Sequence, residues 1–178
     1  MATVVDAKQN APVVSAHDIN IQVAIQLANL VKSTLGPYGM DKEMVDPAGV
    51  VVMTNDGATI LRETKLHHPT ARIITEVART QEENCFDGTT SSVVITGELM
   101  SKAKDLLNLK IHPTRIAKGY TLANRKAQAL LEEIGVDVTD DLLLSVGKTA
   151  MTGKSAEAEQ DQLAEIALNV IKSTTLDN

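Results

Sequence analysis

The sequence contains very few aromatic residues: among its 178 residues there is no Trp, one Phe and two Tyr. A hydrophobic core must therefore be built from Ala, Val, Ile and Leu, a composition that suits packed helices. The shortage of aromatics also removes the stacking surfaces that bind single-stranded nucleic acids. The net charge of −6 argues against a protein that follows a phosphate backbone. We expect a mainly helical protein that does not bind nucleic acid.

Cysteine is also scarce, since Cys85 is the only one. It cannot form a disulfide within the chain, which is typical of a protein of the reducing cytosol. No Cys–His arrangement supports a nucleophile, so we interpret Cys85 as a packed small hydrophobic residue. His67, His68 and His112 lie beside prolines without the spacing of metal ligands, which favours solvated loop positions.

Long hydrophobic runs are absent as well. No segment approaches the roughly 20 apolar residues that cross a bilayer. The first ten residues lack the basic and then apolar order of a secretion signal. We therefore expect a cytoplasmic protein that makes no membrane contact.

What the sequence does contain is helical periodicity. Apolar residues at steps of three and four predict amphipathic helices. Pro69 and Pro113 occupy positions typical of a first helical turn, and Gly135 follows a last turn. Gly97 lies inside a predicted helix and indicates close packing there. The predicted helices cover residues 18–35, a segment from about 69, a segment from about 89, and residues 113–134, 142–150 and 156–171.

Two segments indicate extended structure. Residues 43–46 turn through Pro47, Ala48 and Gly49 into the β-branched run 50–54, which predicts a β-hairpin. Residues 1–15 carry valine pairs around Pro12 without helical spacing, which is typical of an arm or an edge strand that pairs with another segment. The acidic stretch 136–141 indicates a domain boundary.

The segment 86–92 combines a carboxylate, a glycine and four hydroxyl residues directly before an apolar run. This order predicts a loop that enters a helix N-terminus, where unpaired N–H groups attract anions. Gly88 would let the backbone approach a phosphate, while Thr89 and Thr90 would cap the helix or donate hydrogen bonds. Asp87 would repel a phosphate, so its natural partner is a hard cation such as Mg²⁺. An ordinary turn followed by an N-cap explains the same residues.

Four loops combine glycine with residues suited to phosphate or metal: 35–42, 54–59, 87–90 and 151–155. Asp56 and Asp87 would divide nucleophile positioning and metal binding, and Lys154 would supply a positive charge for a terminal phosphate. The pair Gly36-Pro37 is also typical of a helix stop, and Asp56-Gly57 is typical of a hairpin or helix-entry turn. The sequence around Lys154 is not a P-loop, because that motif needs glycine where this chain has Lys148.

Taken together and in this order, the loops resemble the nucleotide-binding segments of group II chaperonins, the thermosome and TRiC/CCT type. The resemblance runs from about Asp18 to the C-terminus. It implies that residues 1–136 are the N-terminal part of an equatorial ATP-binding domain, helical with a small hairpin and an extended N-terminal strand. Residues 137–178 would be the first segment of the intermediate domain. The matching segments are 33–37, 39–42, 54–61, 87–90, 97–99, 112–114 and 152–154.

The resemblance also implies ligands and roles. ATP and Mg²⁺ would be the ligands, with Asp87 binding the metal and Asp56 positioning the attacking water. The hairpin and N-terminal strand would join other chaperonin subunits in a ring, which in the full-length context acts on non-native proteins. The residues implied to bind nucleotide are Leu35, Gly36, Pro37, Asn55, Gly57, Gly88, Thr89, Thr90, Ser91 and Lys154.

Three departures from the family pattern lead us to expect impaired hydrolysis. Phe86 replaces a glycine, and a positive φ at that position would cost about 1–2 kcal/mol. Tyr38 replaces a lysine of the first loop. Family subunits continue well beyond Asn178, so we expect either a fragment or a naturally short relative, incomplete relative to the family and without its second catalytic aspartate. Two alternatives remain, a catalytically silent module that joins or caps a ring and an unrelated small phosphotransferase.

Overall fold

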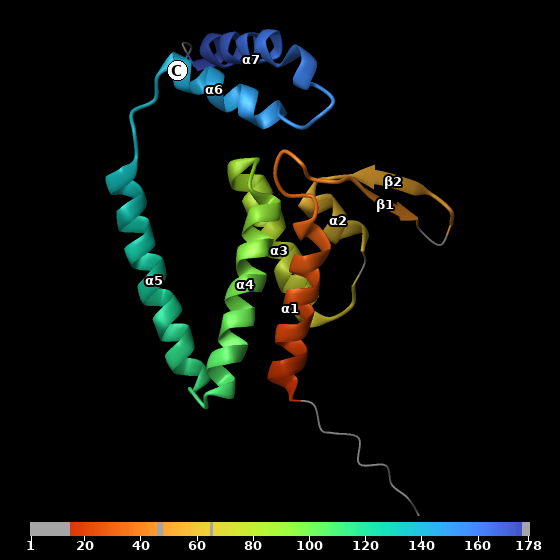
Figure 1. Cartoon of the computed structure of the whole chain (residues 1–178), viewed down its shortest axis with the longest axis vertical. Helices are drawn as coiled ribbons and strands as arrows, with labels where there is room; N and C mark the ends of the chain where they lie inside the picture. Colours follow the sequence, from red (N-terminus) through yellow and green to blue (C-terminus); the bar gives the residue numbers. More distant parts are fainter. Residues whose placement is uncertain (1–14, 46–47, 65, 176–178) are drawn as a thin grey trace, which may run out of the picture. The chain divides into compact units, whose positions relative to one another are not determined.

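A computed structural model of the chain describes residues 15–45, 48–64 and 66–175 (Figure 1). Helices dominate, which confirms the predicted mainly α class with a small hairpin. The predicted N-terminal strand falls on residues outside those described. In chain order the elements are α1 (Ala16–Lys32), β1 (Lys42–Val45), β2 (Val51–Thr54), α2 (Gly57–Glu63), α3 (Pro69–Cys85), α4 (Thr89–Asn108), α5 (Pro113–Ile134), α6 (Asp140–Met151), a 3₁₀ turn (Glu157–Glu159) and α7 (Gln160–Thr175).

The chain divides into two compact units. Unit 1 contains α1, α2, α3 and α4, whereas unit 2 contains the hairpin, the loops that flank it, and α5, α6 and α7. This division does not test the domain boundary predicted near residue 136, which stays a prediction.

The core of unit 1 forms where α1 packs against α4 and α3. The buried residues of α1 recur at steps of three and four, as expected for one helix face. A Cβ atom added at Gly97 of α4 would lie only 2.1 Å from the Cβ atom of Ala28. Glycine is therefore required for this close approach, and the prediction of tight packing at Gly97 is confirmed. The buried residues of α1 are Ile21, Ala24, Leu27, Ala28 and Val31.

Two helices begin with the same tripeptide, His-Pro-Thr. The Nδ1 atom of His68 accepts a hydrogen bond from the Thr70 N–H at the start of α3 (3.2 Å). His112 does the same with Thr114 at the start of α5 (3.3 Å). In both helices a proline occupies the first turn, where its missing N–H is no loss. The sequence analysis missed this capping role of the histidines.

In unit 2 the strands β1 and β2 pair antiparallel, with Lys42 opposite Thr54 and Val45 opposite Val51. Helices α6 and α7 pack as a pair, in which a Cβ atom at Gly147 would lie 3.2 Å from the Cβ atom of Ala164.

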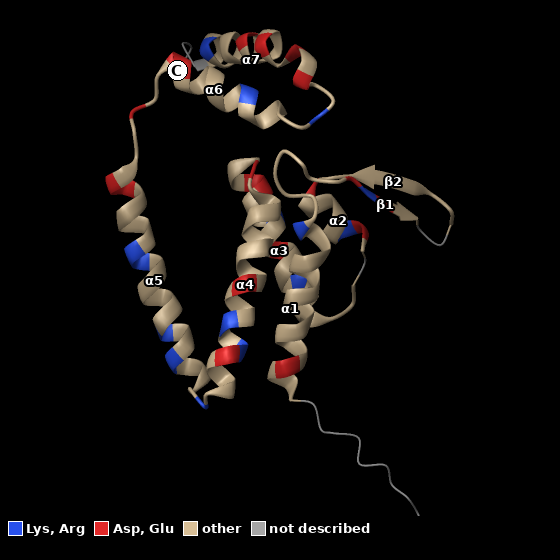
Figure 2. Ribbon diagram, in the orientation of Figure 1, with Lys and Arg blue, Asp and Glu red and all other residues tan. Residues whose placement is uncertain are grey.

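Two ion pairs link α6 and α7. Lys148 pairs with Asp161 at 2.7 Å, and Lys172 pairs with Asp140. Each lysine lies in the last turn of one helix, and its aspartate lies in the first turn of the other (Figure 2). At these ends both charges also interact favourably with the helix dipoles.

Helix α5 contrasts with this pair. Of its residues, all of which are described, Ile116 alone is buried. Leu131 and Ile134 are 65% and 68% exposed. Its charges also oppose its dipole, since Arg115 lies in its first turn and two glutamates lie in its last turn (Figure 2).

Cys85 is a free, exposed residue in the last turn of α3, so the prediction that it packs as a small hydrophobic residue is wrong. It shares the helix face of Ile74 and Ala78, but it is the last residue of α3 and adjoins the exposed connection to α4. In the described part of the chain, none of the helices has the length and apolar character needed to cross a membrane.

Candidate functional site

The connection from α3 to α4 has the conformation that the sequence predicts for a loop entering a helix. Phe86 caps α3 in the left-handed region with φ +56°, and Gly88 precedes α4 with φ +78°. Glycine adopts such angles freely, whereas a side chain costs about 1–2 kcal/mol. Phe86 accepts this strain while its side chain stays 87% exposed. The positive φ that the sequence comparison with the family pattern suggested at position 86 is therefore present.

Asp87 lies between these two residues and is exposed. Its Oδ1 atom accepts a hydrogen bond from the Gly88 N–H at 2.7 Å. Its backbone carbonyl accepts a second one from the side-chain amide of Gln81 at 2.9 Å. The Asp87 carboxylate is thus oriented by its own loop and remains accessible to a ligand from solvent.

Asp56 caps the short helix α2. Its Oδ2 atom accepts a hydrogen bond from the Thr59 N–H at 2.7 Å, and its Oδ1 atom accepts one from the Thr89 hydroxyl at 3.3 Å. The second bond joins the Asp56 loop to the first residue of α4, 33 positions later. The sequence left a hairpin turn and a helix-entry turn open at Asp56-Gly57, and the structure has the helix entry; α2 itself was not predicted, since its 7 residues are too few for a clear periodicity.

Hydrogen bonding also controls the charge of Asp56. Partial burial by itself would raise the pKa of this carboxyl group, because burial disfavours the ionised form. Hydrogen bonds from Thr59, Thr89 and the Ala58 backbone outweigh that effect and hold the pKa below its ordinary value. Asp56 is therefore a carboxylate at neutral pH and can act as a hydrogen-bond acceptor.

The starts of α2 and α4 touch at Gly57. A Cβ atom added there would lie 2.6 Å from the Thr90 hydroxyl oxygen and 3.1 Å from its Cα atom. Thr89 and Thr90 are both buried. The Thr89 side chain donates to Asp56 and does not cap α4, whose N-cap is Gly88. We call this region the α2–α4 junction, defined by Asp56, Gly57, Asp87, Gly88, Thr89 and Thr90; Ser91 follows it, half-buried in the first turn of α4.

Other predicted residues belong to unit 2. Gly36 has φ +86° in a turn closed by hydrogen bonds from Gly39 N–H to the Gly36 carbonyl (2.9 Å) and from Met40 N–H to the Ser33 carbonyl (2.9 Å). Leu35 and Tyr38 are exposed in this loop. Asn55 directly follows β2 and is the last residue of the segment 33–55 of unit 2.

The loop that contains Lys154 approaches this turn within unit 2. Gly153 has φ +76°, and a Cβ atom added there would lie 2.0 Å from the Pro37 carbonyl oxygen. The Lys154 N–H donates to the Met151 carbonyl at 3.1 Å. Unit 2 thus brings the Pro37 and Lys154 loops together, just as unit 1 brings together Asp56 and the start of α4.

Gln81 is a residue near the junction that the sequence analysis missed. It belongs to no glycine-bearing loop, and nothing in its helical surroundings marks it. It also lines a groove between α3 and α4 that contains none of the residues predicted to bind nucleotide. The groove is formed by Ile73, Glu76, Val77, Thr80, Gln81 and Ser92.

Comparison with known proteins gives a consistent result. The profile of the TCP-1/cpn60 chaperonin family matches residues 27–178. Thermosome subunit beta of Methanothermobacter thermautotrophicus is 48% identical over 163 residues, which cover 91% of this chain and 30% of that protein. The thermosome subunit of Methanopyrus kandleri and thermosome subunit beta of Thermococcus kodakarensis are 50% and 51% identical over 160 residues, 88% of this chain and 29% of each relative. The chain therefore spans about 30% of the length of these curated relatives.

Proposed function

Because the chain belongs to the TCP-1/cpn60 chaperonin family, we propose that its α2–α4 junction binds the phosphates of ATP together with Mg²⁺. We further propose that the whole protein uses ATP to close a ring of subunits around non-native proteins. The observation that carries the proposal is the hydrogen bond from Thr89 to Asp56. It joins two acidic, glycine-bearing loops at the N-terminus of a helix of 20 residues.

The roles of the junction residues follow from their chemistry. Asp87 would bind Mg²⁺ through its exposed carboxylate. Since the described residues contain no cluster of three or more His, Cys, Asp or Glu side chains suited to a metal, phosphate and water oxygens would complete the coordination, as Mg²⁺ commonly requires. The bound cation would neutralise charge that develops on the phosphates during hydrolysis.

Gly88 would let phosphate oxygens approach the backbone, and the buried Thr89 and Thr90 would present their N–H groups at the start of α4. Ser91 and Gly57 would border the same phosphates. Asp56, which stays ionised at neutral pH, would orient the water that attacks the terminal phosphorus.

The family resemblance supplies further residues that would bind nucleotide in this proposal. Leu35, Gly36, Pro37 and Asn55 would contact the nucleotide, and Lys154 would contact its terminal phosphate. The close approach of Gly153 to the Pro37 carbonyl supports a shared role for these two loops. Residues 1–136 would belong to an equatorial domain and residues 137–178 to an intermediate domain.

Partners are proposed on similar grounds. Several relatives are named as alpha or beta subunits of a thermosome, which favours a ring of like subunits. The β1–β2 hairpin exposes Val45, Val51 and Met53, and an exposed apolar hairpin is suited to pairing with a neighbouring chain. The cytoplasm is the proposed location.

The metal role is tested by Asp87→Asn, with Asp105→Asn as the matched control. Asp105 lies near the C-terminal end of α4, about 24 Å along the helix from Thr89 at a rise of 1.5 Å per residue. Calorimetry should show that Asp87→Asn loses the Mg²⁺-dependent part of ATP binding, whereas Asp105→Asn retains it. Equal Mg²⁺ dependence in both variants would contradict the role of Asp87.

The hydrolytic role is tested in the complete subunit. Asp56→Asn keeps an N-cap for α2 but removes the charge, so ATP binding should persist while turnover falls. Unchanged turnover would remove Asp56 from the mechanism.

A second candidate is a catalytically silent module that joins or caps a chaperonin ring, and the strained Phe86 beside Asp87 favours it. Calorimetry with ATP and mass measurement in solution separate the two. ATP binding supports the first candidate, whereas association without ATP binding supports the second.

A further inference from the structure

Gln81 connects the body of α3 to the loop that carries Asp87. Its Nε2 atom donates a hydrogen bond to the Asp87 carbonyl at 2.9 Å. The orientation of the side-chain amide follows from this contact, because a carbonyl requires a donor opposite it. A Cβ atom added at Gly88 would lie 3.1 Å from the same Nε2 atom. Gln81 therefore reaches across the loop at the point where position 88 has no side chain.

The peptide between Asp87 and Gly88 needs such a constraint. Glycine populates positive and negative φ with similar ease, so the loop can readily rotate this peptide. One side of the peptide is the Asp87 carbonyl, which Gln81 holds, and the other is the Gly88 N–H, which donates to Asp87 Oδ1 at 2.7 Å. A rotation would break both hydrogen bonds and turn the Asp87 carboxylate away.

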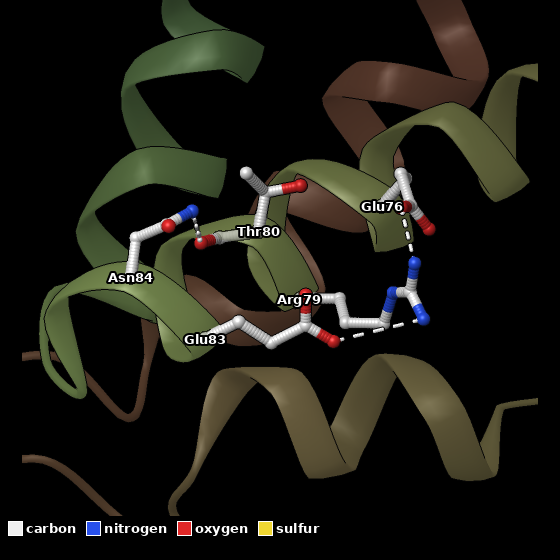
Figure 3. A network of polar contacts seen from close by, with 5 residues as sticks. All are labelled: Glu76, Arg79, Thr80, Glu83 and Asn84. Atoms are coloured by element: carbon white, nitrogen blue, oxygen red, sulfur yellow. Dashed lines mark hydrogen bonds and ion pairs between the residues drawn. The ribbon is translucent and has the colours of Figure 1, made fainter.

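The helix that presents Gln81 offers a matched comparison. Figure 3 shows Arg79 between Glu76 and Glu83, with ion pairs of 2.7 and 3.7 Å, and Asn84 turned toward the Thr80 carbonyl. The Asn84 side chain donates to that carbonyl at 2.8 Å. Asn84 thus makes a hydrogen bond of the same chemical kind, in the same part of α3, to a carbonyl of its own helix instead of to the Asp87 loop.

We propose that Gln81 is a positioning residue that holds the Asp87–Gly88 peptide, and through it the Asp87 carboxylate, in the orientation that receives Mg²⁺ bound to a nucleoside triphosphate. This inference rests on the proposed function of the junction. Gln81 itself touches neither the metal nor the phosphates in this scheme. Its effect is confined to the part of nucleotide binding that depends on Mg²⁺.

The test uses the full chain with Gln81→Met and Gln81→Glu, both of similar size but without the donor, and Asn84→Ala as the control. ATP affinity is measured by calorimetry in excess Mg²⁺ and in EDTA. Loss of one hydrogen bond should weaken binding in Mg²⁺ by about three- to tenfold. Affinity in EDTA should stay within about twofold of wild type, as should both affinities of Asn84→Ala.

A second readout does not require nucleotide. Amide hydrogen exchange at Gly88 should be faster in both Gln81 variants and unchanged in Asn84→Ala, because the peptide loses its anchor. Unchanged exchange at Gly88 would overturn the inference even if one variant bound ATP poorly.

The outcomes separate this inference from the proposed function. If wild type shows Mg²⁺-dependent binding and both Gln81 variants match it, the positioning role is wrong and the proposed function stands. If wild type shows no Mg²⁺-dependent binding, both fall. Equal losses in Mg²⁺ and in EDTA would mean that Gln81 only supports the fold, which contradicts the positioning role.

Discussion

The α1 helix of unit 1 and the α5 helix of unit 2 are both amphipathic, but they differ in how much they bury. Helix α1 has 17 residues and buries five of them. Helix α5 has 22 residues and buries only Ile116. Their sequence patterns predict both helices equally well. Periodicity therefore identifies a helix and its apolar face, but it does not identify what covers that face.

The α6–α7 pair shows a third arrangement. Its aspartates lie in first turns and its lysines in last turns, so that ion pairs and helix dipoles act together. Helix α5 has the opposite charge order. The α6–α7 pair therefore combines a small apolar contact, in which Ala164 and Leu168 are buried, with charges arranged to suit the helix ends, whereas unit 1 has a larger apolar core.

Truncation of a leucine should reveal the contrast most strongly. Leu27 of α1 is 3% exposed and Leu131 of α5 is 65% exposed. Leu27→Ala should lower the free energy of unfolding by about 2–5 kcal/mol, because it leaves a cavity. Leu131→Ala should change it by no more than about 0.5 kcal/mol. Urea unfolding of each variant measures the difference, and similar losses would show that α5 is as well packed as α1.

Replacing a helical glycine with alanine should change the free energy of unfolding in opposite directions in the two units. Gly97→Ala places a methyl group 2.1 Å from the Ala28 Cβ atom, and this overpacking should cost about 1–3 kcal/mol. Gly119 lies in α5 with nothing within 4 Å of an added Cβ atom. Gly119→Ala should therefore stabilise the chain by about 0.5–1 kcal/mol. A destabilising Gly119→Ala would reveal a neighbour for α5 that the fold does not include.

The strained connection within unit 1 should respond next. Phe86→Gly relieves the left-handed strain and should raise the free energy of unfolding by up to about 1 kcal/mol. The gain is smaller than the strain because glycine loses more entropy on folding. Thermal unfolding of Phe86→Gly and of the control Phe86→Ala measures it. Alanine keeps the strain, so a gain of equal size in Phe86→Ala would place the effect in the exposed aromatic ring instead.

The smallest expected effect is in pH dependence, where the units should respond at opposite ends of the scale. Asp56 has a folded pKa below its ordinary value of 3.8. Its contribution is complete above that value and is lost as the pH falls through the folded pKa. Lys148 has a pKa raised above 10.5 by its hydrogen bond and charge interaction with Asp161. Its contribution is complete below 10.5 and is lost as the pH rises through the folded pKa.

Urea unfolding, followed by NMR at a series of pH values, reports on each helix separately. The stability of α2 should fall first in acid, and that of α6 should fall first in alkali. Asp56→Asn should flatten the acid dependence only, and Lys148→Met the alkaline dependence only. Both effects should be modest, because the Lys148 pair is exposed and exposed pairs contribute little. A shared response of α2 and α6 at both extremes would break the distinction between the units.

Much of the fold could be predicted from local patterns. The helix boundaries near Pro69, Pro113 and Gly135, the hairpin and the loop before Thr89 all follow from residue types that restrict φ or supply caps. The short helix α2 was not predicted, because its 7 residues are too few to show a period. The hydrogen bond between Asp56 and Thr59 is a local cap, whereas the one between Asp56 and Thr89 is a tertiary contact that leaves no signal in the sequence.

The candidate site was predicted unevenly for the same reason. Glycine, threonine and aspartate in ordered loops indicated phosphate and metal chemistry. The contact between Gly57 and Thr90, the approach of Gly153 to Pro37 and the hydrogen bond from Gln81 to the Asp87 carbonyl join segments through side chains or close backbones. Such contacts depend on how elements pack and cannot be read from spacing alone.

The most direct measurement is an NMR titration of the chain with ATP in excess Mg²⁺, repeated in EDTA. We predict Mg²⁺-dependent shifts at the amides of Gly57, Gly88, Thr89 and Thr90, with the amide of Gly119 in α5 unmoved as an internal reference. Shifts absent from the α2–α4 junction, or identical with and without Mg²⁺, would contradict the claim that this junction binds magnesium and nucleotide phosphates together.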